Sequence, residues 1–226
     1  MPSLKQVPVA VRQAMGRQIK NATRIAAEHY DAGAANERSL TGALVAKLEE
    51  EVNGQWRDWS WSSRATTLSE APAGVGEDAL GADFVVQVDV YEGGINTAQK
   101  LVLVQGKVRW DDGLESQARK MSAFPGGGIV ADYRPGAYLG VGADDVVRVG
   151  AKRSQLNEKR VRDLGAMLGD DFLECKIGTE DAYVSVDRSR IVFTGKELKH
   201  SPVPLRSDHL LRVSVKNPIK TSHIPE

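Results

Sequence analysis

The sequence predicts an α/β protein in which a mixed β-sheet is flanked by helices. Two segments near the start repeat apolar residues at helical spacing, several later runs alternate as strands do, and a further helical segment separates two groups of strands. A hairpin pairs its strands antiparallel, whereas a helix between strands allows a parallel pair, so the sheet should contain both arrangements. We expect this core within residues 1–150 and a C-terminal, β-rich extension packed on it in residues 151–226.

Two helices are predicted first, over residues 9–29 and 36–52. Each carries an apolar residue at every fourth position, which places one buried stripe along the helix. These residues are Val11, Met15 and Ile19 in the first helix, and Leu40, Leu44 and Leu48 in the second. Asn36 is suited to cap the second helix, and Glu37 lies in its first turn.

Strands and further helices follow. We expect one extended strand over residues 54–63, with Arg57, Trp59 and Trp61 on one face, and a hairpin formed by residues 82–92 and 100–110. The later elements come in chain order: a helix over 111–124 that begins at Asp111 and Asp112, strands over 129–134 and 137–143, a helix over 154–170, a hairpin over 181–195 and a strand over 209–215.

Composition narrows the class of protein. The 226 residues are 41% hydrophobic and 27% charged, which is ordinary for a globular chain with a sizeable core. The formal net charge is zero, whereas nucleic-acid-binding domains are usually basic, although Lys and Arg do gather in 152–162 and 196–220. One cysteine, Cys175, excludes an internal disulfide, and no apolar run reaches membrane-spanning length. We therefore expect a cytoplasmic location and no membrane partner.

Polar residues interrupt the two strands of the predicted central hairpin. Asp83 stands at the start of the first strand, and Gln105 and Lys107 share one face at the end of the second. If Glu37 packs across them, two carboxylates, an amide oxygen, the Gly106 carbonyl and an ammonium group would meet. Such oxygens suit Mg²⁺ or Mn²⁺, which can lower the pKa of a bound water. Lys107 would orient or deprotonate that water, or stabilise charge on a phosphate.

Each of these residues also has an ordinary structural interpretation. Asp83 can end a loop, Lys107 can be a solvated strand end, and Glu37 can complement the helix dipole. Asp89 and Glu92, further along the first strand of the hairpin, are expected to face solvent.

The order of these residues resembles the PD-(D/E)XK nuclease superfamily, also called restriction-endonuclease-like. Asp83 followed by "QGK" at 105–107 resembles its QxK subgroup, in which glutamine replaces the usual acidic residue. That subgroup includes type IV (Mrr-like) restriction enzymes and many nuclease effectors of bacterial anti-phage systems. "NERSLTGALVAKL" resembles the first helix of the fold, where a glutamate often joins the metal site, and the match falls on Glu37. "GLESQARKM" and "GGGIVADYR" resemble the next helix and strand, so the resemblance covers roughly residues 36–135.

The resemblance implies a restriction-endonuclease-like sheet and a DNA endonuclease that depends on Mg²⁺ or Mn²⁺, acting in restriction or anti-phage defence. It implies catalytic roles for Glu37, Asp83, Gln105 and Lys107, and metal ligands at Glu37, Asp83, Gln105 and Gly106. DNA is then the expected partner, and both a homodimer and association with other proteins of a defence system are compatible with it. Contacts to DNA are expected at Arg109, Gln117 and Lys120, because the helix after the QxK strand often flanks the site; a plain surface role is the alternative.

Other functions stay open. The same fold with an inactive site could serve as a DNA-binding or assembly subunit, and the substrate could be RNA or branched DNA. The tryptophans at 56, 59 and 61 either stack on bases or pack in the core or a dimer interface. The basic residues Arg153, Lys159, Arg160 and Arg162 either contact phosphates or form a solvated face.

Overall fold

The computed structural model describes residues 3–30, 36–68, 80–188, 190–194 and 202–218. Within these ranges nine strands form one mixed sheet in the order β1-β2-β13-β4-β5-β6-β7-β8, with β9 paired to β5 beside that path. Four strands form a second sheet in the order β10-β11-β12-β3. The strands are β1 Gly54–Trp56, β2 Trp59–Thr67, β3 Leu80–Gly81, β4 Phe84–Glu92, β5 Ile95–Lys107, β6 Gly128–Arg134, β7 Ala137–Gly142, β8 Arg162–Asp163, β9 Thr179–Glu180, β10 Ala182–Ser185, β11 Arg190–Phe193, β12 Val203–Arg206 and β13 His209–Asn217.

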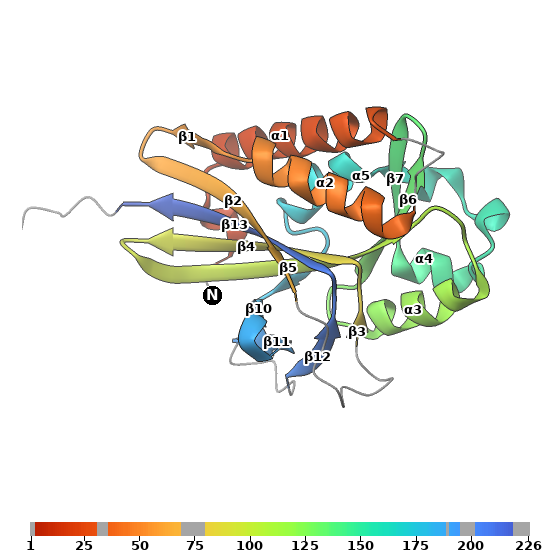
Figure 1. The fold of residues 1–226 in the computed structure, drawn as a ribbon. Coiled ribbons are helices and arrows are strands. Elements are labelled where there is room, and N and C mark those ends of the chain that lie inside the picture. Colours follow the sequence, from red (N-terminus) through yellow and green to blue (C-terminus); the bar gives the residue numbers. More distant parts are fainter. Residues whose placement is uncertain (1–2, 31–35, 69–79, 189, 195–201, 219–226) are drawn as a thin grey trace, which may run out of the picture.

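Helices cover both faces of the large sheet. The α-helices are α1 Val9–Glu28, α2 Glu37–Glu51, α3 Asp112–Ala123, α4 Ala143–Arg148 and α5 Leu164–Ala166. Figure 1 shows α1 and α2 on one face, and α3, α4 and the small sheet on the other. The fold class predicted from the sequence, a mixed sheet flanked by helices, is therefore confirmed.

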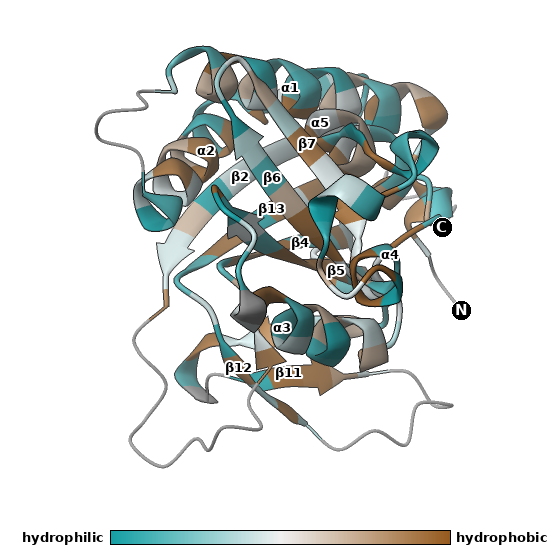
Figure 2. Cartoon of the chain, turned by 90° about the vertical axis from the view of Figure 1, so that its right-hand side faces the viewer, coloured by the Kyte–Doolittle hydropathy of each residue, from teal (hydrophilic) through white to brown (hydrophobic). Residues whose placement is uncertain are grey.

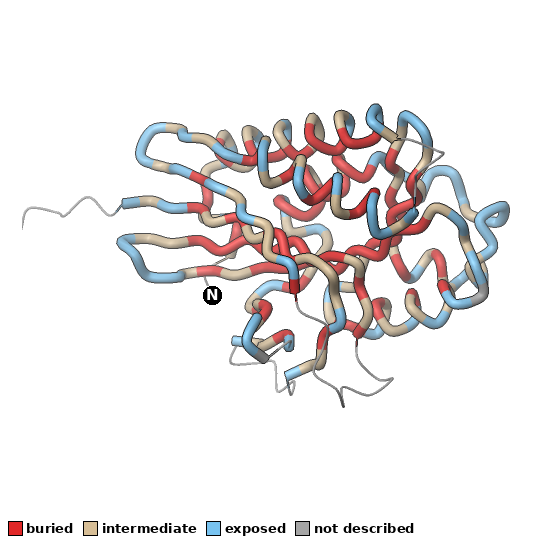
Figure 3. Tube along the Cα trace, viewed as in Figure 1, coloured by how far each residue is buried: buried red, intermediate tan, exposed pale blue. Residues whose placement is uncertain are grey.

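The central strands are buried on both sides, which produces two cores. Alternate residues of a strand point to opposite faces, so Phe84 and Val86 join α1 and α2 in one core while Val85 and Leu103 join α3 in the other. Figure 2 shows these strands as an apolar layer between helices whose outer sides are hydrophilic. In Figure 3 the central strands are buried along their middle, and the tips of the β1–β2 and β4–β5 hairpins are exposed.

The predicted helices and the central hairpin form for local reasons. Asn36 caps α2: its side-chain oxygen accepts a hydrogen bond from the Ser39 amide, and its own amide donates one to Ser39 Oγ. β4 and β5 are antiparallel and turn at Gly93 and Gly94, both with positive φ, a conformation that glycine adopts without steric cost. β5 and β6 are parallel because α3, capped by Asp111, connects them.

The last described strand lies inside the large sheet. β13 pairs antiparallel with β2 and parallel with β4, so residues 209–217 separate two strands that come earlier in the chain. We expected these residues in an extension packed on the core of 1–150. The sheet instead takes one of its inner strands from them, because Leu211, Val213 and Val215 of β13 pack in the core beneath α1 and α2, and Leu210 packs in the other core.

Two predicted elements were wrong. Residues 54–63 are not one strand: β1 and β2 form a hairpin, and Arg57 lies in its turn with φ 53°. The helix expected over 154–170 is replaced by two 3₁₀ turns (Arg153–Gln155 and Glu158–Arg160), β8, α5 and a π-helical turn (Met167–Phe172). The side chains of Asn157 and Asp163 bind nearby backbone amides, which competes with a continuous helix and starts α5 late.

The sequence did not predict the short helix α4. Trp61 is buried and its indole donates to Gln18, so for this tryptophan the core interpretation is confirmed. None of the helices in the described part of the chain combines the length and apolar character needed to cross a membrane. Residues 69–79 and 219–226 lie outside the described part of the chain.

Candidate metal-binding and catalytic site

Asp83 lies directly before β4 and reaches the end of β5. Its Oδ2 accepts a hydrogen bond from the Gly106 amide at 2.7 Å, and its own amide donates to the Val104 carbonyl at 3.0 Å. These bonds continue the pairing of β4 with β5, so the hairpin register places the Asp83 carboxylate beside Gln105, Gly106 and Lys107. The proximity expected from the sequence is confirmed for this part of the site.

Glu37 closes the site from α2. Its Oε2 lies 3.1 Å from Lys107 Nζ, and its Oε1 accepts from the Val108 amide at 3.3 Å. The Lys107 side chain is 8% exposed and that of Glu37 34% exposed. The interpretation of Lys107 as a solvated strand end is therefore wrong: it is a nearly buried ammonium paired with a carboxylate.

The Asp83 carboxyl is unusually easy to protonate. Burial raises the pKa of Asp83 to about 6, and the hydrogen bonds from Gly106 and Gln105 and the charge of Lys107 offset only part of this effect. A buried carboxylate that nearby donors do not fully compensate favours a cation close to it.

Gly106 is required by the close approach of an aromatic ring. A Cβ at this position would lie 2.5 Å from Tyr133 Cε2 and 2.8 Å from the Tyr133 hydroxyl oxygen. Tyr133 is itself buried, and its hydroxyl lies 3.0 Å from Thr41 Oγ1 of α2 in a hydrogen bond. The Gly106 backbone therefore rests on a ring that is held between the sheet and α2.

We expect Gly106→Ala to destabilise the protein by about 1–3 kcal/mol, because the added methyl group must displace the Tyr133 ring. Urea unfolding followed by fluorescence measures this loss. Gly81→Ala is the matched control, since a Cβ at Gly81 meets no atom within 4 Å. Equal stability of the two variants would show that Tyr133 does not constrain residue 106.

The oxygen atoms at this end of the sheet fit a hard cation. Asp83 and Glu37 supply carboxylates, Gln105 an amide oxygen, and Gly106 a carbonyl oxygen that lies 3.5 Å from Gln105 Nε2. Within the described ranges no three His, Cys, Asp or Glu side chains gather as a metal cluster. A cation here would therefore use two carboxylates and neutral oxygens, a donor set typical of Mg²⁺ or Mn²⁺.

The residues expected to contact DNA follow β5 in the chain. Arg109 is exposed just beyond the strand, and Lys120 is half-buried on α3. Gln117 is also half-buried, and its Oε1 is enclosed without a hydrogen-bond partner among the described residues. Their role at a nucleic acid stays a prediction.

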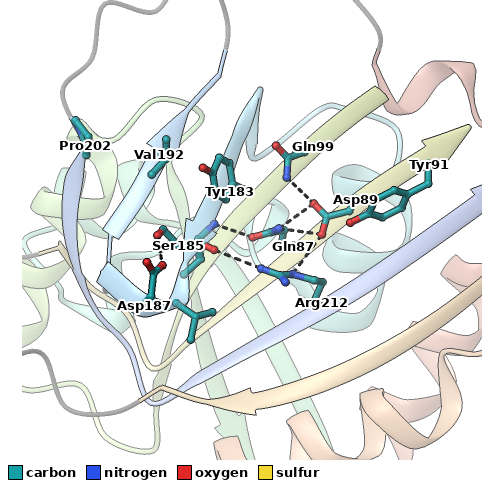
Figure 4. A pocket seen from close by; sticks show the side chains of 12 residues that line it. Gln87, Asp89, Tyr91, Gln99, Tyr183, Ser185, Asp187, Val192, Pro202 and Arg212 are labelled. Atoms are coloured by element: carbon teal, nitrogen blue, oxygen red, sulfur yellow. Dashed lines mark hydrogen bonds and ion pairs between the residues drawn. The ribbon is translucent and has the colours of Figure 1, made fainter. Parts of the chain in front are cut away.

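A second polar cluster lies along the same face of β4, where solvent was expected. Asp89 is 1% exposed, so the expectation that it faces solvent was wrong. Its carboxylate accepts from the side-chain amides of Gln87 at 2.8 Å and Gln99 at 2.9 Å, and Arg212 Nε lies 3.3 Å away as an ion pair. Figure 4 shows these side chains converging at one wall of a pocket of about 600 Å³.

This cluster attaches β10 to the large sheet. Gln87 Oε1 accepts from the Val184 amide at 2.8 Å, and Arg212 donates to the Val184 carbonyl at 3.3 Å. Both backbone groups of a β10 residue are thus bound by side chains from β4 and β13. The carboxylate of Asp89 already accepts from two side-chain amides and lies beside one guanidinium group, which indicates a structural role rather than a reactive one.

Sequence reasoning missed Asp89 and Asp132, and in both cases a signal was present. Gln87 and Asp89 stand two and four residues after Val85, on one face of an otherwise apolar strand. Asp132 interrupts the apolar run of β6 in the same way. A polar residue inside an apolar alternation indicates a buried partner, but the sequence does not say which residue that is.

No family model, no curated protein and no solved structure matches this chain.

Proposed function

We propose that the protein has a restriction-endonuclease-like fold and is a metal-dependent DNA endonuclease. The observation that carries the proposal is the buried Lys107–Glu37 pair beside an Asp83 carboxylate that is bound to the Gly106 amide. A sheet edge that faces solvent does not require a nearly buried lysine next to two carboxylates. The same groups suit hydrolysis of a phosphodiester.

Each residue has a definite part in this proposal. Asp83, Glu37, the Gln105 amide oxygen and the Gly106 carbonyl would hold Mg²⁺ or Mn²⁺, which when bound neutralises phosphate charge and acidifies a water. Lys107 orients the attacking water or stabilises charge on the phosphate. Glu37 holds the Lys107 ammonium in position, and Tyr133 supports the Gly106 backbone.

The setting follows from the same resemblance. We propose that the substrate is DNA and that the enzyme works in the cytoplasm in restriction or anti-phage defence. A homodimer would allow both strands to be cut, and partner proteins of a defence system would supply target recognition. The resemblance covers residues 36–135, and the segments that carry it form α2, β4, β5, α3 and β6. β13 lies outside this range.

Cleavage of supercoiled plasmid and of single-stranded DNA tests the proposal, in Mg²⁺, in Mn²⁺ and in EDTA. We expect metal-dependent cleavage that falls by about 10²–10⁴-fold in Lys107→Ala, because the variant loses the group that assists proton transfer or charge stabilisation. Lys47→Ala is the control: this lysine lies on α2 and pairs with Glu50 at the surface. Cleavage that survives in EDTA, or that Lys107→Ala retains, would contradict the proposed site.

A second candidate is a nuclease-fold subunit that binds DNA or assembles with other proteins without cutting. It is favoured by the fact that Lys107 and Glu37 already neutralise each other and that the net charge is zero. Calorimetric titration with Mn²⁺ separates the two candidates. Binding that Asp83→Ala abolishes supports the enzyme, whereas no binding to the wild-type protein supports the subunit.

A further inference from the structure

Asp132 is a buried carboxylate immediately beside the proposed site. It lies on β6 directly opposite Lys107 of β5, in parallel register, so both residues project from the same face of the sheet. The Asp132 side chain is 4% exposed. Neighbouring strands are about 4.8 Å apart, so Asp132 and Lys107 are adjacent residues on one face of the sheet.

Two arginines converge on one oxygen of this carboxylate. Arg134, two residues further along β6, places Nη2 2.7 Å from Asp132 Oδ2. Arg153, from the 3₁₀ turn after α4, places its Nη2 2.7 Å from the same atom. The two guanidinium groups carry two positive charges and share one negative charge, so the cluster retains a formal charge of +1.

The cluster is exposed where a ligand could reach it. The Arg134 side chain is 42% exposed and that of Arg153 38% exposed, so part of each guanidinium faces outward while Asp132 stays covered. Asp132 Oδ1 is enclosed and has no hydrogen-bond partner among the described residues. Other arginine pairs of the described surface, such as Arg24–Glu28 and Arg148–Asp145, match one arginine to one carboxylate.

We propose that Arg134 and Arg153, held together by Asp132, bind a backbone phosphate of the DNA strand next to the phosphodiester that is cut. This inference rests on the proposed nuclease function and names the group that positions its substrate. One phosphate brings the charge of the cluster to zero. Guanidinium groups bind phosphate oxygens through paired N–H donors, and a buried carboxylate that fixes both of them lowers the entropy lost on binding.

Salt-dependent DNA binding tests this inference. A fluorescently labelled DNA duplex is titrated in EDTA, where the proposed enzyme does not cut, at several salt concentrations. The double variant Arg134→Gln/Arg153→Gln is expected to bind about tenfold more weakly. The slope of log K against log salt should become shallower by about 0.9, because one phosphate contact is lost. Arg24→Gln, which removes one exposed arginine of α1, should leave both quantities unchanged.

A conservative variant separates phosphate binding from a purely structural ion pair. Arg153→Lys keeps the charge and the partner Asp132 but loses the planar pair of donors. We expect it to keep the melting temperature and the salt slope of the wild-type protein while binding the duplex several-fold more weakly. A wild-type affinity in this variant, together with a wild-type slope in the double variant, would overturn the inference.

The outcomes distinguish this inference from the proposed function. If the wild-type protein cuts DNA and the double variant binds with an unchanged slope, the arginine pair is not a phosphate site and the nuclease proposal stands. If the wild-type protein neither binds nor cuts DNA, both proposals fail. If it binds a labelled single-stranded RNA and not DNA, and the double variant lowers the salt slope of that binding by about 0.7, the stated DNA substrate is overturned.

Discussion

The Asp83→Asn variant is expected to lose DNA cleavage and yet to be more stable than the wild-type protein at neutral pH in EDTA. Burial raises the pKa of Asp83 to about 6, above its ordinary value of 3.8. Between these values the folded protein binds more protons than the unfolded chain, so the stability of the wild-type protein falls as pH rises through this window. Asparagine has nearly the same shape and no charge, so the variant avoids this loss, which amounts to about 3 kcal/mol at most.

Urea unfolding at a series of pH values measures the difference. The two proteins should be equally stable below the window, diverge across it, and keep a constant difference above pH 6. Addition of Mg²⁺ should then raise the stability of the wild-type protein and leave the variant unchanged, because only a folded site with the carboxylate binds the ion. Asp58→Asn, at an exposed position in the β1–β2 turn, is the control. A difference of the same size at acidic and neutral pH would contradict the assignment to Asp83.

The Asp89→Ala variant is expected to lose about 3–5 kcal/mol of stability, the largest loss that we expect for any substitution outside the proposed site. Removal of this carboxylate leaves the side-chain amides of Gln87 and Gln99 without an acceptor and Arg212 without its counter-charge. The attachment of β10 weakens as well, because Gln87 and Arg212 hold the Val184 backbone.

A smaller change at the same position refines this prediction. Asp89→Asn keeps the shape and one acceptor oxygen, so it should cost about 1–3 kcal/mol. Asp58→Ala at the surface should change stability by less than about 0.5 kcal/mol. Denaturant midpoints provide all three values, and limited proteolysis reports whether β10 and β11 detach first. A loss for Asp89→Ala no larger than that for Asp58→Ala would show that the cluster contributes nothing.

The features that the sequence predicts well depend on neighbours in the chain. Asn36 starts α2 through a bond to Ser39, and the Gly93–Gly94 turn joins β4 to β5 as an antiparallel hairpin. A shift of one residue in the pairing, between Val90 and Tyr91, completes the register that brings Asp83 to Gly106. To predict the position of Glu37, one further assumption was needed: that α2 packs across the end of β5. The hydrogen bond between Lys107 and Glu37 agrees with this assumption.

The features that the sequence did not predict depend on residues far apart in the chain. Alternating apolar residues identify 209–215 as a strand, but they do not say between which strands it inserts. Asp89 is buried, and its partners Gln87 and Arg212 bind the backbone of Val184, which is distant from both in the chain. Asp132 lies opposite Lys107, but its arginine partner at 153 comes from a 3₁₀ turn that the sequence did not predict.

The position of β13 has a consequence for the order in which the molecule can be assembled during synthesis. β2 and β4 leave the ribosome early, yet the space between them stays unfilled until residues 209–217 have emerged. Until then both strands present unpaired edges. Such edges of a nascent chain have to be shielded, because exposed edges lead to aggregation. β4 follows directly on Asp83, so the strand that begins beside this carboxylate stays without its second neighbour until residues 209–217 have been translated.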